Sequence, residues 1–556
     1  MKRNHFLVLV GLALCALFGY WLGHATRPEN FQLQGKLTFD PTQVPSADYD
    51  TGDYIVRWRT ENGGQLTVEA KDRPGIVLWQ TIPGEAFVMA AQANETVTEN
   101  RGMFQFQDRW QVVCSDQTVD SFQQSEYGLI QIKGLLDCSD NSTFTYDVYF
   151  GKAPSSNAGI TVDINNKSNR VFLTYASSPN EHFFGFGEQF TYFDMKGKKV
   201  PIWVSEQGVG RGEQPLTFFA DLTNGGAGGS AFTSYAPMPF YLTNKMRGIS
   251  RLSCDSNHAC YSVFDLRKPD RVQIEVWSSE LQMNIMNGSS PQEIIHQNLF
   301  APVYGTTLPV LPEWVFSKAI VGMQGGTDKV HKTYAKLKER NTPITAFWLQ
   351  DWVGQRVTSF GKQLWWNWEV DYDRYPGWEQ LVSELNKDGV NVMVYISPYL
   401  ADIGNLKPNV RRNLFQEAKE KGYLVKNSVG EPYLVQNTDF YFGMVNLFDS
   451  NARHWYKNVI EEQVIGVGAK GWMADFGEGL PFDTAVGFYT GAEFHNDYPL
   501  FWAMLNREIV YETDKDIVFF NRAASTISPH YAPLFWEGDQ LVDWSAEDGI
   551  KSAVTG

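Results

Sequence analysis

The chain has 556 residues, of which 43% are apolar and 20% are charged, a composition typical of globular proteins rather than disordered ones. This length exceeds a single hydrophobic core and predicts two or more domains. Acidic residues number 63 against 47 basic ones, which gives a formal net charge of −16. Because nucleic-acid binding needs a basic surface, this balance argues against a nucleic-acid partner.

The first 30 residues read as a targeting segment. Lys2 and Arg3 precede an uncharged apolar run over residues 6–23. Such a run is long for a signal peptide and just long enough to span a bilayer. We therefore predict a signal anchor at 1–30, with a cleaved signal peptide as the alternative. Because the positive flank stays in the cytosol, the predicted localisation is the secretory pathway, as a single-pass type II membrane protein or a secreted one.

Cysteine usage agrees with an oxidising compartment. Apart from Cys15, the cysteines are Cys114, Cys138, Cys254 and Cys260. Proximity favours the pairs 114–138 and 254–260 among three possible connectivities. Glycosylation acceptor triplets start at Asn94, Asn141, Asn166 and Asn287 and fit the same route.

Beyond the targeting segment, the chain divides into two regions of different pattern. Over 31–312, short alternating runs such as 54–59 and 271–277 are separated by turn residues, which predicts an antiparallel β-sandwich.

Over 313–556, apolar strands alternate with helices, which predicts a (β/α)₈ TIM barrel. The principal strands are expected near 319–323, 344–348, 390–396, 472–475, 517–520 and 534–536. Since only six are counted before Gly556, we expect a barrel that is incomplete at its C-terminus and a truncated chain.

Two of these strands end in carboxylates. The apolar run that begins at Gly471 stops at Asp475, and Glu478 follows three residues later. Residues 533–539 repeat the arrangement and end in Asp539. Barrel enzymes place their chemistry at the carboxyl ends of strands, and glycosidic bond cleavage requires two carboxylates.

The segment Trp-Met-Ala-Asp-Phe-Gly-Glu at 472–478 resembles the nucleophile motif of glycoside hydrolase family 31, in the branch that contains bacterial sulfoquinovosidases. The resemblance extends from about residue 185 to the C-terminus. Further matching motifs lie at 185–189, 203–211, 351–362, 522–523 and 536–540.

The resemblance implies a retaining α-glycoside hydrolase acting on terminal α-linked sugars by double displacement, with Asp475 as nucleophile and Asp539 as acid/base. Asp539 needs a raised pKa, which its apolar neighbours could supply by desolvation. Glu478 is expected to orient the nucleophile or bind a hydroxyl group, with a plain loop salt bridge as the alternative. Arg522 matches an arginine beside the nucleophile that reaches the sugar, although such arginines also brace loops.

The resemblance also assigns substrate-binding positions. Residues matching Gln324, Gln350 and Trp366 contact the sugar in sulfoquinovosidases, and all three types are kept. Gln363 stands where those enzymes hold an arginine that grips the sulfonate, and glutamine lacks that charge. A neutral α-linked hexose is therefore favoured over sulfoquinovose, although Arg356 and Lys362 are cations near that position.

In the family, a loop of the β-sandwich reaches the active site, and the stretch with Glu188 and Gln189 is a candidate for it. No cofactor and no metal are expected, because two carboxylates and water suffice for hydrolysis. Two rival functions are a carbohydrate-binding relative without turnover and a folding or trafficking partner in the secretory pathway.

Overall fold

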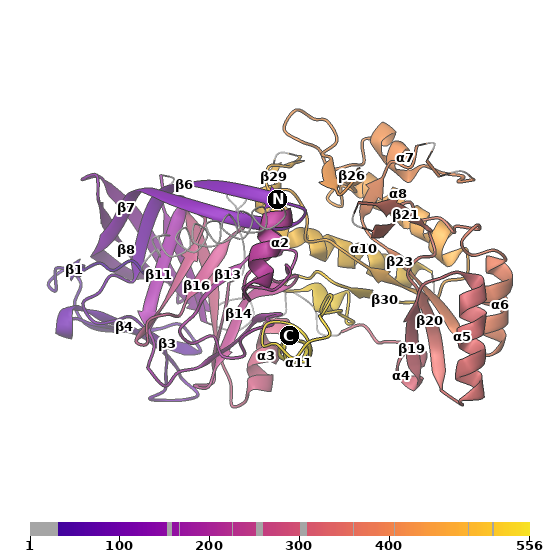
Figure 1. Ribbon diagram of the computed structural model, residues 1–556. Helices are drawn as coiled ribbons and strands as arrows, with labels where there is room; N and C mark the ends of the chain where they lie inside the picture. Colours follow the sequence, from indigo (N-terminus) through magenta and orange to yellow (C-terminus); the bar gives the residue numbers. More distant parts are fainter. Residues whose placement is uncertain are drawn as a thin grey trace, which may run out of the picture.

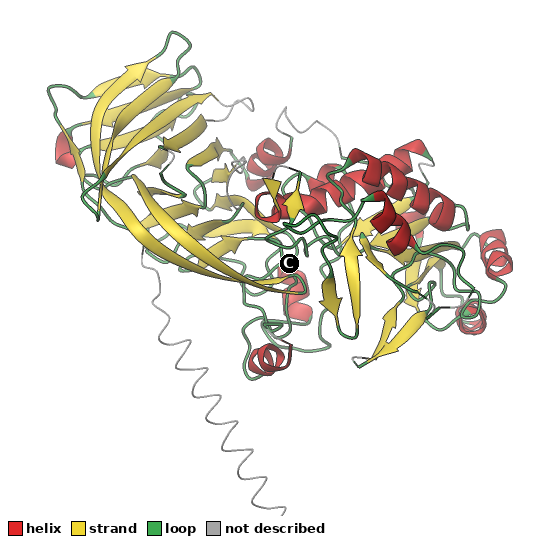
Figure 2. Ribbon diagram, turned by 90° about the horizontal axis from the view of Figure 1, so that it is seen from above, coloured by secondary structure: helices red, strands yellow, loops and turns green. Residues whose placement is uncertain are grey.

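The computed structural model describes residues 32–152, 158–165, 167–224, 226–251, 260–300, 308–359, 361–404, 406–407, 409–487, 489–513 and 516–556. The N-terminal half consists almost entirely of strands. The C-terminal half combines a parallel sheet with helices, and the two halves lie side by side (Figures 1 and 2).

The predicted localisation is corrected by the structure. Within the ranges above, no helix is both long and apolar enough to cross a bilayer. The prediction of a type II membrane protein or a secreted protein, attached to a membrane through its N-terminal segment, is therefore not upheld. The segment 1–30 itself lies outside the described residues.

The N-terminal half contains a large sheet in the order β12-β14-β15-β18-β10-β9-β8-β7-β6-β11-β17-β16-β13, to which β1 adds by pairing with β7. Every pairing in this sheet is antiparallel except that between β1 and β7. Its strands are β1 (Leu37–Phe39), β6 (Val88–Asn100), β7 (Met103–Gln124), β8 (Ile130–Cys138), β9 (Thr143–Lys152), β10 (Ala158–Ile164), β11 (Arg170–Ala176), β12 (Phe183–Gly187), β13 (Lys199–Ile202), β14 (Pro237–Thr243), β15 (Arg247–Arg251), β16 (Ser262–Asp265), β17 (Arg271–Val276) and β18 (Glu280–Asn287).

A smaller antiparallel sheet packs against the large one. It consists of β2 (Ala47–Asp50), β3 (Tyr54–Arg59), β4 (Gln65–Ala70) and β5 (Val77–Gln80). Alternation along β3, β4 and β8 turns Trp58, Leu66 and Ile132 into one buried cluster shared by both sheets. The predicted antiparallel sandwich is confirmed. Two helices, α2 (Leu216–Asn224) and α3 (Pro291–Leu299), also belong to this half.

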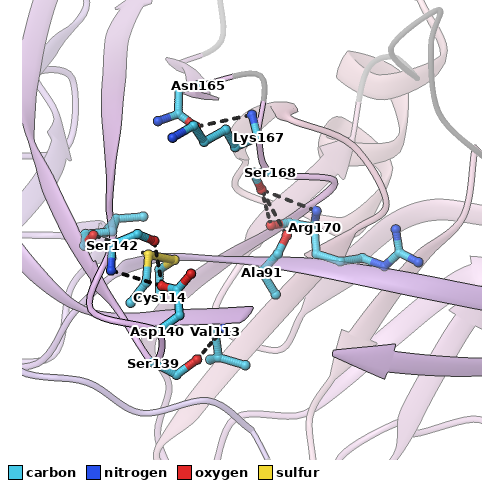
Figure 3. The surroundings of a disulfide bond; sticks show 12 residues. Ala91, Val113, Cys114, Ser139, Asp140, Ser142, Asn165, Lys167, Ser168 and Arg170 are labelled. Carbon is cyan, nitrogen blue, oxygen red and sulfur yellow. Dashed lines mark hydrogen bonds between the residues drawn. A yellow bond between two sulfur atoms is a disulfide. The ribbon is translucent and has the colours of Figure 1, made fainter. Parts of the chain in front are cut away.

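One disulfide joins neighbouring strands of the large sheet. Cys114 of β7 and Cys138 of β8 are register partners, and their sulfur atoms are bonded (Figure 3). The turn that follows β8 is held by Asp140, whose Oδ1 accepts hydrogen bonds from the backbone N (3.0 Å) and the hydroxyl (2.6 Å) of Ser142. The predicted pair 114–138 is confirmed; Cys254 of the second pair lies outside the described residues.

The C-terminal half is built around a parallel sheet in the order β19-β20-β23-β27-β30. Four of its strands, β20, β23, β27 and β30, are mostly buried, as expected where helices and loops cover both faces of a parallel sheet, whereas the edge strand β19 is largely exposed. The bounds are β19 (Ala319–Met323), β20 (Ile344–Leu349), β23 (Asn391–Ile396), β27 (Gly471–Ala474) and β30 (Val518–Asn521). The helices are α4 (Trp314–Ser317), α5 (Thr327–Glu339), α6 (Trp378–Lys387), α7 (Leu414–Lys421), α8 (Ser450–Ile460), α9 (Gly491–Phe494), α10 (Tyr498–Glu512) and α11 (Ile550–Thr555).

Smaller sheets lie in the connections of this half. They are formed by β21 (Gln355–Thr358) with β22 (Gly361–Leu364), by β24 (Tyr399–Ala401), β25 (Val435–Asn437) and β26 (Phe440–Met444), and by β28 (Ala485–Val486) with β29 (Tyr489–Thr490).

The predicted strand at 534–536 is only partly formed. Phe535 makes a single parallel bridge with Asn521 of β30. In the part of the chain that the structure describes, the sheet therefore has five parallel strands in chain order, as in a TIM barrel, and β19 and β30 are its edge strands.

Candidate active site

Asp475 and Arg522 come together because they follow two neighbouring strands. In the parallel register, Ala474 at the end of β27 is opposite Asn521 at the end of β30. The next residue of each strand therefore lies at the same edge of the sheet. Arg522 Nε is 3.2 Å from Asp475 Oδ1, and both side chains are buried.

A third strand fixes the other carboxylate oxygen of Asp475. Tyr395 of β23 donates its hydroxyl proton to Asp475 Oδ2. The Asp475 backbone N donates to the carbonyl of Ile396 at 2.9 Å. Burial, together with the charge of Asp475, raises the pKa of Tyr395 well above its ordinary value, which keeps the phenol a donor. The carboxylate thus accepts a hydrogen bond at Oδ2 and is in an ion pair at Oδ1.

Arg522 joins two further carboxylates to this pair. Its Nη2 atom contacts Glu478 Oε1 and lies 3.2 Å from Glu206 Oε2. Three carboxylates around one guanidinium carry a formal charge of −2 when all are ionised. Burial raises the pKa of Glu478. The positive charge of Arg522 lowers this pKa, and the negative charges of Glu206 and Asp475 raise it further. We call Asp475, Glu478, Arg522 and Glu206 the ionic cluster.

Glu206 comes from the β-sandwich half and was not among the predicted site residues. Its carboxylate accepts a hydrogen bond from the hydroxyl of Tyr235, whose ring lies 4.4 Å from the Arg522 guanidinium. Glu206 falls inside the motif at 203–211 that carries the family resemblance. That motif could have indicated Glu206, but no local pattern gives it a chemical role.

The β-sandwich loop at the site is also not the one predicted. The tip of the β6–β7 hairpin, at Gly102, approaches the cluster, and its carbonyl accepts from the Glu206 N at 2.8 Å. Glu188 instead is buried and accepts from Ser234 Oγ at 2.9 Å. Burial raises the pKa of Glu188 to about 8. Neither Glu188 nor Gln189 lines the cavity described next.

A cavity of about 390 Å³ adjoins the ionic cluster. Four of the predicted site residues line it, namely Glu478, Asp539, Gln363 and Trp366. Asp475 and Arg522 do not; Arg522 stacks against Tyr235 and Phe476, and those two rings form part of the wall. The other lining residues include Arg101, Gly102, Met103, Glu206, Gln207, Tyr399, Phe442, Gln540 and Asp548.

Asp539 reaches the cavity on a segment that the β-sandwich half holds in place. Its backbone carbonyl accepts from Gln207 Nε2 at 2.6 Å and from Arg211 Nη2 at 3.4 Å. Burial raises the pKa of Asp539, with further contributions from the charges of Asp475 and Asp548. This is the direction that a proton donor requires. Asp475 and Asp539 therefore influence one another electrostatically across the site.

The predicted sugar-binding residues separate into two places. Gln363 and Trp366 lie on the cavity wall, where Gln363 Oε1 accepts from Thr438 Oγ1 at 3.0 Å. Gln324 and Gln350 follow β19 and β20 and are bonded to each other, away from the cavity lining. Gln355 Nε2 also donates to Gln324 Oε1 at 3.1 Å.

The two cations near Gln363 differ in environment. Arg356 is its cross-strand partner in the β21–β22 hairpin, and its guanidinium is buried 3.9 Å from the centre of the Phe440 ring. Its Nη2 donates to the Trp365 carbonyl at 2.7 Å, and burial lowers its pKa to about 10. Lys362 is exposed. Neither residue lines the cavity.

Comparison with known families gives two matches along the chain. Residues 55–251 match the glycosyl hydrolase 31 N-terminal galactose mutarotase-like domain. Residues 308–551 match the glycosyl hydrolases family 31 TIM-barrel domain.

Individual relatives are similar over much of the chain. A sulfoquinovosidase from Escherichia coli K12 is 37% identical over 394 residues, and one from Agrobacterium fabrum is 34% identical over 392 residues. Each alignment covers 70% of this chain and 56% of the relative, so the chain spans little more than half of their length. A solved family 31 sulfoquinovosidase from E. rectale, in complex with an aza-sugar inhibitor, superposes with a TM-score of 0.75 at 29% identity, covering 92% of this chain and 71% of that one.

Proposed function

The chain belongs to glycoside hydrolase family 31, and we propose that it is a retaining α-glycosidase that cleaves terminal α-linked sugars. One observation carries the proposal. Asp475 follows β27 at its carboxyl end, with Oδ2 hydrogen-bonded to Tyr395 and Oδ1 in an ion pair with Arg522, beside a cavity that Asp539 lines. Double displacement requires a nucleophile and a proton donor at one site.

In the proposed first step, an Asp475 oxygen attacks the anomeric carbon and forms a glycosyl ester. The bond to the leaving oxygen breaks at the same time, and Asp539 gives that oxygen its proton. In the second step, the Asp539 carboxylate takes a proton from water, and the water oxygen displaces Asp475. The cycle returns both carboxyl groups to their starting states.

The other members of the ionic cluster have supporting roles in this mechanism. Arg522 orients Asp475 through Nε and ties it to Glu478 through Nη2. Glu478 also faces the cavity, where it is placed to accept a hydrogen bond from a sugar hydroxyl. Trp366 contributes an aromatic wall, since its ring packs edge-on against Phe442 and Phe476 with centroids 5.0 and 5.5 Å away.

Two substrate classes are compatible with this proposal. Gln363, which is neutral and bonded to Thr438, favours an uncharged α-hexoside such as an α-glucoside. The similarity to two sulfoquinovosidases and to a solved one favours an α-sulfoquinovoside.

A mechanism-based cyclitol epoxide tests the proposal. Opening of the epoxide by the nucleophile leaves a covalent adduct, which mass spectrometry of peptides assigns to a residue. We expect the adduct on Asp475, and we expect Asp475→Asn to abolish it. As a matched control, Asp483→Asn alters an exposed carboxylate outside the cavity and should label like the parent chain.

Absence of the adduct from the parent chain would contradict the proposal. If a simple α-glycoside still bound in that case, the result would support the rival function, a carbohydrate-binding relative without turnover.

A further inference from the structure

The tip of the β6–β7 hairpin brings an unpaired cation into the cavity. β6 and β7 extend from the β-sandwich toward the C-terminal half (Figures 1 and 2), and their register closes with Asn100 opposite Met103. Arg101 and Gly102 therefore form a two-residue turn. Arg101, Gly102 and Met103 all line the cavity beside the ionic cluster.

The backbone of this turn is unfavourable for arginine. Both central residues have positive φ, 55° at Arg101 and 82° at Gly102, as in a type I′ turn. Such turns strongly prefer Asn-Gly, Asp-Gly or Gly-Gly, because side chains with a bulky Cβ substituent disfavour positive φ. The arginine at the first position is thus locally unfavourable. Strain of this kind concentrates where a side chain serves a function.

The tip is seated firmly on the ionic cluster. The Gly102 carbonyl accepts from the Glu206 N at 2.8 Å. A Cβ added to Gly102 would lie 3.5 Å from Gly479 Cα, 3.7 Å from Glu478 Cγ and 3.9 Å from Glu206 Cβ. The backbone next to Arg101 is therefore in contact with the site, which fixes the position of the Arg101 Cα atom at the cavity wall.

The Arg101 guanidinium makes no ion pair with any described carboxylate that lines the cavity. The lining contains four carboxylates, on Glu206, Glu478, Asp539 and Asp548, and within the described part of the chain Arg101 is its sole cation. Glu206 and Glu478 already pair with Arg522, and Asp548 lies 3.5 Å from Arg211. No hydrogen bond, ion pair or ring contact joins Arg101 to another described residue.

We propose that Arg101 is a specificity-determining residue that binds an anionic group of the substrate, a sulfonate, carboxylate or phosphate, in this cavity. The guanidinium supplies two parallel donors, which match two oxygens of such a group. This inference rests on the proposed glycosidase function, because it concerns the substrate of the same site. Arg101 of the β-sandwich half would thus supply the positive charge that the neutral Gln363 lacks.

The anionic group has two possible positions, on the sugar itself or on the leaving group, and one set of probes separates them. Dissociation constants are measured by calorimetry in the Asp475→Asn chain, so that binding is observed without turnover. The charged probes are methyl α-sulfoquinovoside and 4-carboxyphenyl α-glucoside. Their neutral counterparts are methyl α-glucoside and 4-nitrophenyl α-glucoside.

We expect one charged probe to bind roughly 10- to 100-fold more tightly than its counterpart, the range of a charge-assisted hydrogen bond. Arg101→Asn should remove this preference and leave the neutral probes unchanged. The Arg101→Asn chain should unfold at the same or a higher temperature, because asparagine suits the turn. Arg109→Asn, an exposed arginine of β7 outside the cavity lining, is the matched control and should keep the preference.

The inference is overturned if neither charged probe binds more tightly than its counterpart, or if Arg101→Asn retains the preference. These outcomes do not depend on catalysis. Failure of the epoxide to label Asp475 would reject the proposed function while the binding preference could still be present.

Discussion

The residues that follow β27 and β30 differ in environment from those that follow β19 and β20. After β27 and β30, Asp475 and Arg522 are buried and are joined by Glu206 from the β-sandwich half. After β19 and β20, Gln324 donates a hydrogen bond to Gln350 and accepts one from Gln355 of the same half. Both pairs lie at the carboxyl ends of strands in the same sheet. Of these two pairs, the one after β27 and β30 is the one that receives a carboxylate from the β-sandwich half.

The largest loss of stability is expected from a substitution in the ionic cluster. Arg522→Met leaves Asp475 and Glu478 buried without their shared cation, and loss of one partner from a buried ion pair costs about 3–5 kcal/mol. We therefore expect the free energy of unfolding, measured by urea titration, to fall by this amount.

Arg356→Met is the matched control for that substitution. Arg356 is also a buried arginine, but in the described structure it stacks on aromatic rings and donates to a carbonyl, with no carboxylate partner. Methionine leaves the Trp365 carbonyl without this donor, which should cost about 1–3 kcal/mol. Equal losses for the two variants would show that the cluster's carboxylates do not depend on Arg522.

A second prediction concerns pH at the ionic cluster. Burial raises the pKa of Glu478 from 4.5 to about 7, so the folded state favours the protonated carboxyl. Its contribution to stability is complete below pH 4.5 and is lost as pH rises through about 7. We expect the unfolding free energy of the parent chain to decline across this interval more steeply than that of Glu478→Gln.

The difference between the two chains is the quantity that tests this prediction, because other buried carboxyls act in the same direction. The pKa of Glu188 is raised to about 8 and that of Asp497 to about 6, again chiefly by burial. If the unfolding free energies of the parent and the Glu478→Gln chain changed equally with pH, the carboxyl that is protonated on folding would not be Glu478.

The smallest effect is expected at the pair of Gln324 and Gln350. Gln350→Ala removes an acceptor of Gln324, and substitutions of this kind outside a core usually change stability by less than about 0.5 kcal/mol. If Gln350 contacts the sugar as the family resemblance implies, KM for an α-glycoside should rise roughly 2- to 10-fold, the loss of one neutral hydrogen bond. Steady-state kinetics with an unchanged KM would remove Gln350 from the binding site.

The apolar run before Asp475 predicted β27 and its terminal carboxylate correctly, because a buried parallel strand is a local pattern that a short stretch of sequence displays. The run at 534–536 carried the same pattern and yielded a single bridge. The residues that follow it are held by Gln207 and Arg211 of the other half, an interaction that no local pattern contains.

Local sequence pattern predicted the sandwich, five of the six principal strands of the C-terminal half and the position of Asp475 at a strand end, and it favoured the Cys114–Cys138 pair. The contact between Glu206 and Arg522, 316 positions apart, and the place of Arg101 at the cavity became visible in the three-dimensional fold. The physical reason is that periodicity reports the burial of a segment, whereas the partner that buries it is chosen by packing between distant parts of the chain.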